Sequence, residues 1–200
     1  MANNVADNPT SGSPVGGAPV VMLNALHSDL NSCIVFSEPG AYATSSSLYL
    51  SIFCYEIVGG AVHNKLVLLK CDSSCDTANW SYIGTVLDKN DATAFGYKNF
   101  SGSDLFKSGS DIFLMVSPVT DYPWTDSYSG CLIFKFSDIN TGILEGDPLP
   151  TQYKAIMGSS GTFNGACAYH EDANGSGFLY GEVNADASDF FRLFNSRQSL

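Results

Sequence analysis

The sequence predicts an all-β fold, most simply a β-propeller-like set of antiparallel blades, with a β-sandwich as the alternative. Short apolar runs alternate with Gly-, Ser- and Asp-rich corners, and no apolar pattern of helical period is convincing. One pattern, an acidic or small residue before two short strands and a polar corner, occurs at Glu38, Asp104 and Gly165. The spacings (104 − 38 = 66 and 165 − 104 = 61) indicate a repeated unit of about 60 residues, which is typical of a propeller blade.

The clearest copy of this pattern covers residues 100–120. Two β-rich runs flank the corner 107–111, so the stretch predicts a hairpin. Its second run, residues 112–116, is continuously apolar, as expected of a strand that is buried on both faces.

The domain organisation follows from these repeats. Residues 1–18 are rich in Asn, Pro, Ser and Gly and predict a flexible leader. Residues 19–200 predict a single domain of about three repeats, at 37–98, 99–160 and 161–200. The third repeat is about one strand short, and a three-bladed disc would leave sheet edges exposed.

Within the repeats, further apolar runs are bounded by turn residues and predict individual strands. The runs are residues 30–36, 65–71, 80–87, 130–136, 153–157 and 190–194.

Composition narrows the classes of partner. Asp and Glu number 20 against 9 Lys and Arg, giving a net charge of −11, so nucleic acid is not expected as a partner. No apolar run approaches the length of about 20 residues that a membrane-spanning helix needs.

A secreted or extracellular location is expected, although no signal peptide is visible in this sequence. Lysine is scarce, and three Asn-x-Ser/Thr sites, at Asn79, Asn99 and Asn174, are candidate glycosylation sites in a glycosylating host.

The six cysteines allow three disulfides with 15 connectivities, and Cys71 and Cys75 form the one local pair. We expect a disulfide between them, because a zinc site would need two further ligands at matching spacing. The other four lie in strand-like runs and could equally be buried thiols: Cys33, Cys54, Cys131 and Cys167.

No cofactor is expected. The loop 88–91 has oxygen-rich side chains that could hold calcium, but it lacks the glycine and final glutamate of a known calcium loop. A solvated turn is therefore favoured there.

The residues 68–72, followed by Asn79 and Trp80, resemble part of the five-bladed propeller glycosidases, the arabinanase, β-xylosidase and levansucrase-like enzymes. The resemblance covers about residues 33–197, and its motifs are short. Such enzymes typically carry three acids at the inner ends of successive blades. Glycoside cleavage needs two carboxylates on either side of the scissile bond.

Transferred to this chain, the resemblance places the first two acids at Glu38 and Asp104, the candidate catalytic residues. The third acid should be a Glu near 164–165, where the chain has Asn164 and Gly165. No obvious general acid is then present. The length also departs from the family, because about three repeats are present instead of five blades.

Candidate substrate-binding residues are Asn164, His170 and the aromatic loop with Tyr122 and Trp124. Aromatic faces suit sugar rings, whereas Trp80 lies in a predicted strand and fits a core position better.

Three hypotheses remain. The first is a carbohydrate-binding or interaction module without efficient catalysis. The second is a glycoside hydrolase, or part of one, that uses Glu38 and Asp104. The third is a subunit of an extracellular assembly, a homo-oligomer joined through exposed sheet edges.

Overall fold

The protein forms three antiparallel β-sheets in the computed structural model. The structure describes residues 23–72, 75, 80–120, 128–146, 148–156, 164–172, 175–182, 192–196, 198 and 200. The predicted leader, residues 1–18, lies outside this part of the chain. The all-β prediction is confirmed, since the sheets contain all but a few of the described secondary-structure elements.

The first sheet, blade 1, has four strands in chain order: β1 (Val35–Ala43), β2 (Ser47–Val58), β3 (Ala61–Asp72) and β4 (Trp80–Leu87). Blade 2 contains β5 (Asn99–Ser108), β6 (Asp111–Val119), β7 (Cys131–Asp138), β8 (Ile143–Leu144) and β9 (Gln152–Ile156). Blade 3 contains β10 (Asn164–Asp172), β11 (Gly175–Glu182) and β12 (Arg192–Ser196).

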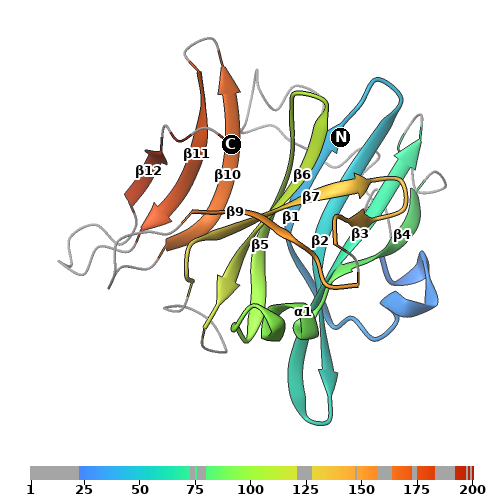
Figure 1. The fold of residues 1–200 in the computed structure, drawn as a ribbon. Helices are drawn as coiled ribbons and strands as arrows, with labels where there is room; N and C mark the ends of the chain where they lie inside the picture. Colours follow the sequence, from blue (N-terminus) through green and yellow to red (C-terminus); the bar gives the residue numbers. More distant parts are fainter. Residues whose placement is uncertain are drawn as a thin grey trace, which may run out of the picture.

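The blades fan out side by side, and β5 packs between β1 and β10, the first strands of the neighbouring blades (Figure 1). In blade 2 two short strands, β8 and β9, both pair with β7 and together take the position of a fourth strand. Blade 3 has three strands in the part of the chain that the structure describes.

Both faces of the central strands are buried, which explains their continuous apolar sequences. In β3, Leu66 and Leu68 pack toward blade 2, while Val67 and Leu69 pack on the opposite side. This alternation follows from the two-residue period of a strand. A further core joins blades 2 and 3, where Phe178 packs against the β6 and β7 side chains.

The outer face of blade 1 is covered by the segment 23–34, which contains the short 3-10 helices η2 (Leu23–Ala25) and η3 (Ser28–Leu30). Leu30 and Cys33 are buried against β2 and β3. The His27 ring stacks on Tyr82 of β4, with 4.6 Å between ring centroids. Blade 1 is therefore enclosed on both faces.

Disulfides join all six cysteines. Cys71 pairs with Cys75, Cys33 with Cys54, and Cys131 with Cys167. The last of these connects β7 of blade 2 to β10 of blade 3. The alternative of buried free thiols is therefore wrong for the four cysteines in strand-like runs.

One short α-helix, α1 (Lys89–Ala94), lies where the sequence predicts a loop. The Asp88 carboxylate accepts the backbone N–H groups of Asn90 and Asp91, and the Asp91 carboxylate accepts the N–H of Asp88. This is a capping box, which stabilises the first turn of a helix. The expectation of a solvated turn is wrong for this reason, and calcium binding there stays a prediction.

No helix among the described residues has the length and apolar character needed to cross a bilayer.

Candidate functional site

The first strands of the three blades carry the same backbone irregularity. Each has a register shift against its partner strand: β1 between residues 37 and 40, β5 between 101 and 103, and β10 between 165 and 168. Within each shift one residue has a left-handed backbone, namely Glu38 (φ 56°), Gly102 (φ 52°) and Ala166 (φ 51°). These bulge residues are evenly spaced (102 − 38 = 166 − 102 = 64), so they are equivalent positions of the three blades.

This register corrects the anchors predicted from the sequence. The predicted anchors were Glu38, Asp104 and Gly165, whereas the residues equivalent to Glu38 are Gly102 and Ala166. The position of Asp104 corresponds to Gly40 of blade 1, two residues beyond the bulge. Residue type does not mark the equivalent positions, because the equivalence is one of backbone conformation.

The half-buried Glu38 carboxylate lies against the bulge of blade 2. Its Oε2 accepts the Gly102 backbone N–H at 2.9 Å and the Ser101 hydroxyl at 2.5 Å. Its Oε1 accepts the Tyr128 hydroxyl at 3.2 Å. Both carboxylate oxygens are therefore engaged in joining blade 1 to blade 2.

Tyr128 also reaches blade 3. Its ring lies so close to Gly165 that a β-carbon there would be 2.3 Å from the Tyr128 Cδ2 atom. Burial raises the pKa of Tyr128 to about 12, and the Glu38 charge adds to this while the Ser101 hydrogen bond opposes it. The phenol is consequently a neutral hydrogen-bond donor at physiological pH.

Three further serines, two of them buried, complete the cluster. The Ser103 hydroxyl donates to the Glu38 backbone carbonyl at 2.9 Å and lies 3.0 Å from the Ser51 hydroxyl. The fully buried Ser117 hydroxyl accepts the Ala166 backbone N–H at 2.9 Å. Two bulge residues thus donate their backbone N–H to a side chain of the preceding blade. Gly102 donates to Glu38 of blade 1, and Ala166 donates to Ser117 of blade 2.

Asp104 has a different role from Glu38. Its Oδ2 accepts the backbone N–H of Tyr169 in β10 at 2.9 Å. Burial raises the pKa of Asp104, against the lowering effect of the Tyr169 and Leu105 N–H groups. The two predicted acids therefore bridge different pairs of blades, Glu38 from blade 1 to blade 2 and Asp104 from blade 2 to blade 3.

The structure places the other predicted residues as follows. The backbone of Asn164 begins β10 beside the bulge and pairs with Glu182. His170 lies toward the other end of β10, where its Nε2 is 3.1 Å from the Asn195 Oδ1. Trp80 packs at the edge of the blade 1 outer core, in line with the core interpretation.

Several predicted residues lie outside the described part of the chain: Tyr122, Trp124, Asn79 and Asn174. The described chain breaks off after Thr120 and resumes at Tyr128, which forms a bridge with Val119. Tyr128, the first described residue after the predicted aromatic loop, is therefore itself part of the bulge cluster.

Asn99, the third predicted glycosylation site, is only 3% exposed, and Ser101 of the same Asn-x-Ser site donates to Glu38. Glycosylation at Asn99 stays a prediction.

The sequence did not point to Tyr128, Ser101 or Ser117 as parts of this cluster. Gly102, next to Ser101, offers a weak signal, since glycine with a left-handed backbone is common at one type of bulge. Tyr128 offers none, because it is 90 residues from Glu38 in the sequence.

Comparisons of the sequence found no match to a known protein-family model and none to a curated protein. Solved structures do match in fold. A xylan β-1,4-xylosidase from Bacillus halodurans gives a TM-score of 0.52 at 11% identity, over 84% of this chain and 30% of that one. A β-fructofuranosidase from Bombyx mori, in complex with sucrose, gives 0.50 at 14% identity, over 74% of this chain and 30% of that one.

These matches confirm the predicted likeness to propeller glycosidases at the level of the fold. The chain has a β-propeller-like fold, and it spans about a third of the length of the enzymes that it matches.

Proposed function

We propose that this chain is an extracellular, propeller-like carbohydrate-binding module without efficient catalysis. The observation that carries the proposal is the identity of the three equivalent bulge residues, of which only Glu38 has a carboxylate, while Gly102 and Ala166 have none. Propeller glycosidases are expected to present three acids at the inner ends of successive blades, so two of the three would be missing here.

The single remaining carboxylate also has a structural task. Ser101, Gly102 and Tyr128 all donate to Glu38, so its oxygens hold the two blades together. These three donors occupy all but one of the about four acceptor sites of a carboxylate, which leaves little capacity for a reacting proton. The arrangement therefore supports a structural role for Glu38, as part of a rigid polar surface that contacts a sugar, more than a role as a reacting group.

Carbohydrate is proposed as the ligand on two grounds. The xylosidase and the β-fructofuranosidase with this fold act on sugars, as their names state. The predicted aromatic residues Tyr122 and Trp124 belong to a segment whose flanking bridge, Val119 with Tyr128, adjoins the bulge cluster. Disulfides join all six cysteines, which favours an oxidising compartment.

The test combines binding and turnover on the full chain. We expect saturable binding on an array of plant and microbial glycans, reduced by Trp124→Ala, together with no release of the aryl group from nitrophenyl arabinoside or xyloside. If the chain does release the aryl group, and Glu38→Gln or Asp104→Asn abolishes this activity, the proposal of a non-catalytic module is wrong and the chain is a glycosidase.

A specific observation favours this second candidate, glycoside hydrolysis with Glu38 and Asp104. Burial raises the pKa of Asp104, as a general acid requires. Against it, the Asp104 carboxylate accepts a backbone N–H from Tyr169, a bond that favours the ionised form.

A further inference from the structure

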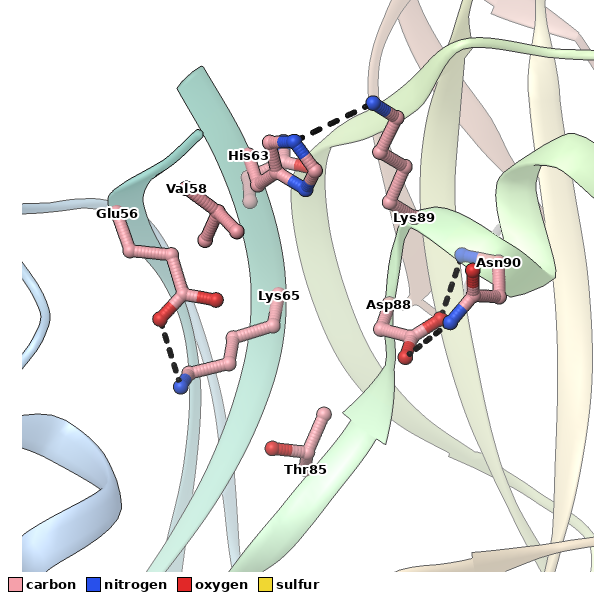
Figure 2. A pocket seen from close by; sticks show the side chains of 9 residues that line it. Glu56, Val58, His63, Lys65, Thr85, Asp88, Lys89 and Asn90 are labelled. Atoms are coloured by element: carbon pink, nitrogen blue, oxygen red, sulfur yellow. Dashed lines mark hydrogen bonds and ion pairs between the residues drawn. The ribbon is translucent and has the colours of Figure 1, made fainter. Parts of the chain in front are cut away.

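Blade 1 has a cavity of about 500 Å³ that shares no residue with the bulge cluster. It lies between the ends of β2, β3 and β4 and the start of α1 (Figure 2). Most of its lining side chains are polar or charged: Glu56, Val58, His63, Asn64, Lys65, Thr85, Asp88, Lys89 and Asn90. The resemblance to glycosidases assigns no role to these residues.

On one wall the charges are already neutralised. Glu56 Oε2 accepts the Lys65 ammonium at 3.1 Å and the Ser32 hydroxyl at 2.7 Å. These contacts, the Ser32 hydrogen bond first, lower the pKa of Glu56. Lys65 donates as well to the Asp29 carbonyl at 2.9 Å. This ion pair forms the left wall in Figure 2.

On the opposite wall the Asp88 carboxylate keeps its negative charge, but its oxygens already have hydrogen-bond donors. The Asp88 carboxylate accepts the backbone N–H groups of Asn90 and Asp91 and the Asn90 side-chain amide. Its oxygens are thereby engaged in capping α1 (Figure 2).

Lys89 and His63, at the end of the cavity between these walls, are different. The Lys89 Nζ atom lies 3.4 Å from His63 Nε2, and both side chains are only partly exposed. An ammonium can donate three hydrogen bonds, and an imidazole that accepts at Nε2 carries its proton at Nδ1. Among the described residues, no acidic side chain forms an ion pair with Lys89, and no acceptor binds His63 Nδ1.

We propose that this end of the cavity, formed by Lys89 and His63, binds a small ligand through an oxyanion, either a carboxylate or a phosphate. The oxyanion would accept from the Lys89 ammonium and from the imidazole, compensating a partly desolvated positive charge in a protein whose net charge is −11. Asn90 and Thr85 line the same cavity and offer further polar contacts to the rest of the ligand.

The test uses amide chemical shifts of the full chain during titration with sodium phosphate or sodium acetate, against sodium chloride at equal ionic strength. We expect saturable shifts around residues 63–65 and 88–90 with one of the two oxyanions, and which one binds tighter decides between phosphate and carboxylate. Lys89→Met should weaken this binding about tenfold, since it removes a charge-assisted hydrogen bond. Lys70→Met is the matched control, because Lys70 pairs with Asp72 elsewhere on blade 1.

His63→Gln should also weaken the binding, since it removes the imidazole N–H that would donate to the oxyanion. Shifts that fail to saturate, that chloride reproduces, or that persist unchanged in Lys89→Met would each overturn the proposal.

Discussion

The Glu38 carboxylate of blade 1 accepts the backbone N–H of Gly102 in blade 2 at 2.9 Å, and both residues have the same left-handed backbone conformation. One bulge therefore binds the equivalent bulge of the next blade.

Glu38→Ala should lower the free energy of unfolding by about 1–3 kcal/mol, because the Gly102 N–H and the Ser101 hydroxyl lose a partly buried acceptor. Alanine keeps the strain of the positive φ, so the change isolates the carboxylate. Urea denaturation measures the effect. Glu145→Ala, which removes an exposed partner of Lys135, is the control and should change stability little.

Ala166→Gly should stabilise the protein by about 1 kcal/mol, because an alanine with a left-handed backbone is strained and glycine is not. Ala166 is exposed, so little packing is lost. Ala168→Gly, two residues along the same strand, lacks the positive φ and should destabilise. Thermal unfolding of the two variants gives the comparison, and equal shifts of the same sign would contradict it.

Gly40→Ala should be strongly destabilising. A β-carbon at Gly40 would lie 2.7 Å from the Ser103 carbonyl oxygen and 2.8 Å from the Asp104 Cα, which are backbone atoms of the neighbouring blade. Such overpacking costs about 1–3 kcal/mol or more. In Gly84→Ala the new β-carbon meets nothing within 4 Å, so this variant should be neutral or slightly stabilising.

The pH dependence of stability should change in Asp104→Asn. Because burial raises the pKa of Asp104 in the folded chain, its protonated form favours folding. This stability is present below the ordinary pKa of about 3.9 and is lost as the pH rises through the folded-state pKa. Unfolding free energies measured from pH 4 to 7 should therefore improve for the variant relative to the wild type.

Asp72→Asn provides the control of opposite sign. The Ser47 hydrogen bond, followed by that of Lys70, lowers the pKa of Asp72. Its contribution is present at neutral pH and lost as the pH falls through the lowered pKa, so this variant should lose stability at neutral pH only. The same trend in both variants would contradict the assignment.

Removal of the Cys131–Cys167 disulfide by double serine substitution should cost more than removal of Cys71–Cys75. The sequence separations are 36 and 4 residues. Loop-closure entropy then predicts about 4 kcal/mol against about 2 kcal/mol. Hydrogen exchange should report the loss for Cys131–Cys167 first in β10 and β11, since that bond joins blade 3 to blade 2.

The strands could be predicted because their signal is local. Residues 80–87 were expected as a strand and form β4, since turn residues bound the run and its side chains alternate. The capping box is present in the sequence as two aspartates three residues apart, Asp88 and Asp91, but the oxygen-rich residues 88–91 were interpreted as a solvated turn. A six-residue helix is too short to show an apolar period.

The site was predicted less well because bulges are backbone features. Glutamate, glycine and alanine occupy the three equivalent positions, so no residue type marks them. Glu38 was identified only because it is an acid, and Asp104 was paired with it for the same reason. The contact between Glu38 and Tyr128 depends on tertiary packing across 90 residues, which a single sequence does not reveal.

The segment 23–34 also bears on how such molecules could associate. Leu30 and the Cys33–Cys54 disulfide fix it on the side of blade 1 that faces away from blade 2. For a second copy to stack on this face of blade 1, the segment 23–34, which is buried there and linked by the disulfide, would first have to be displaced.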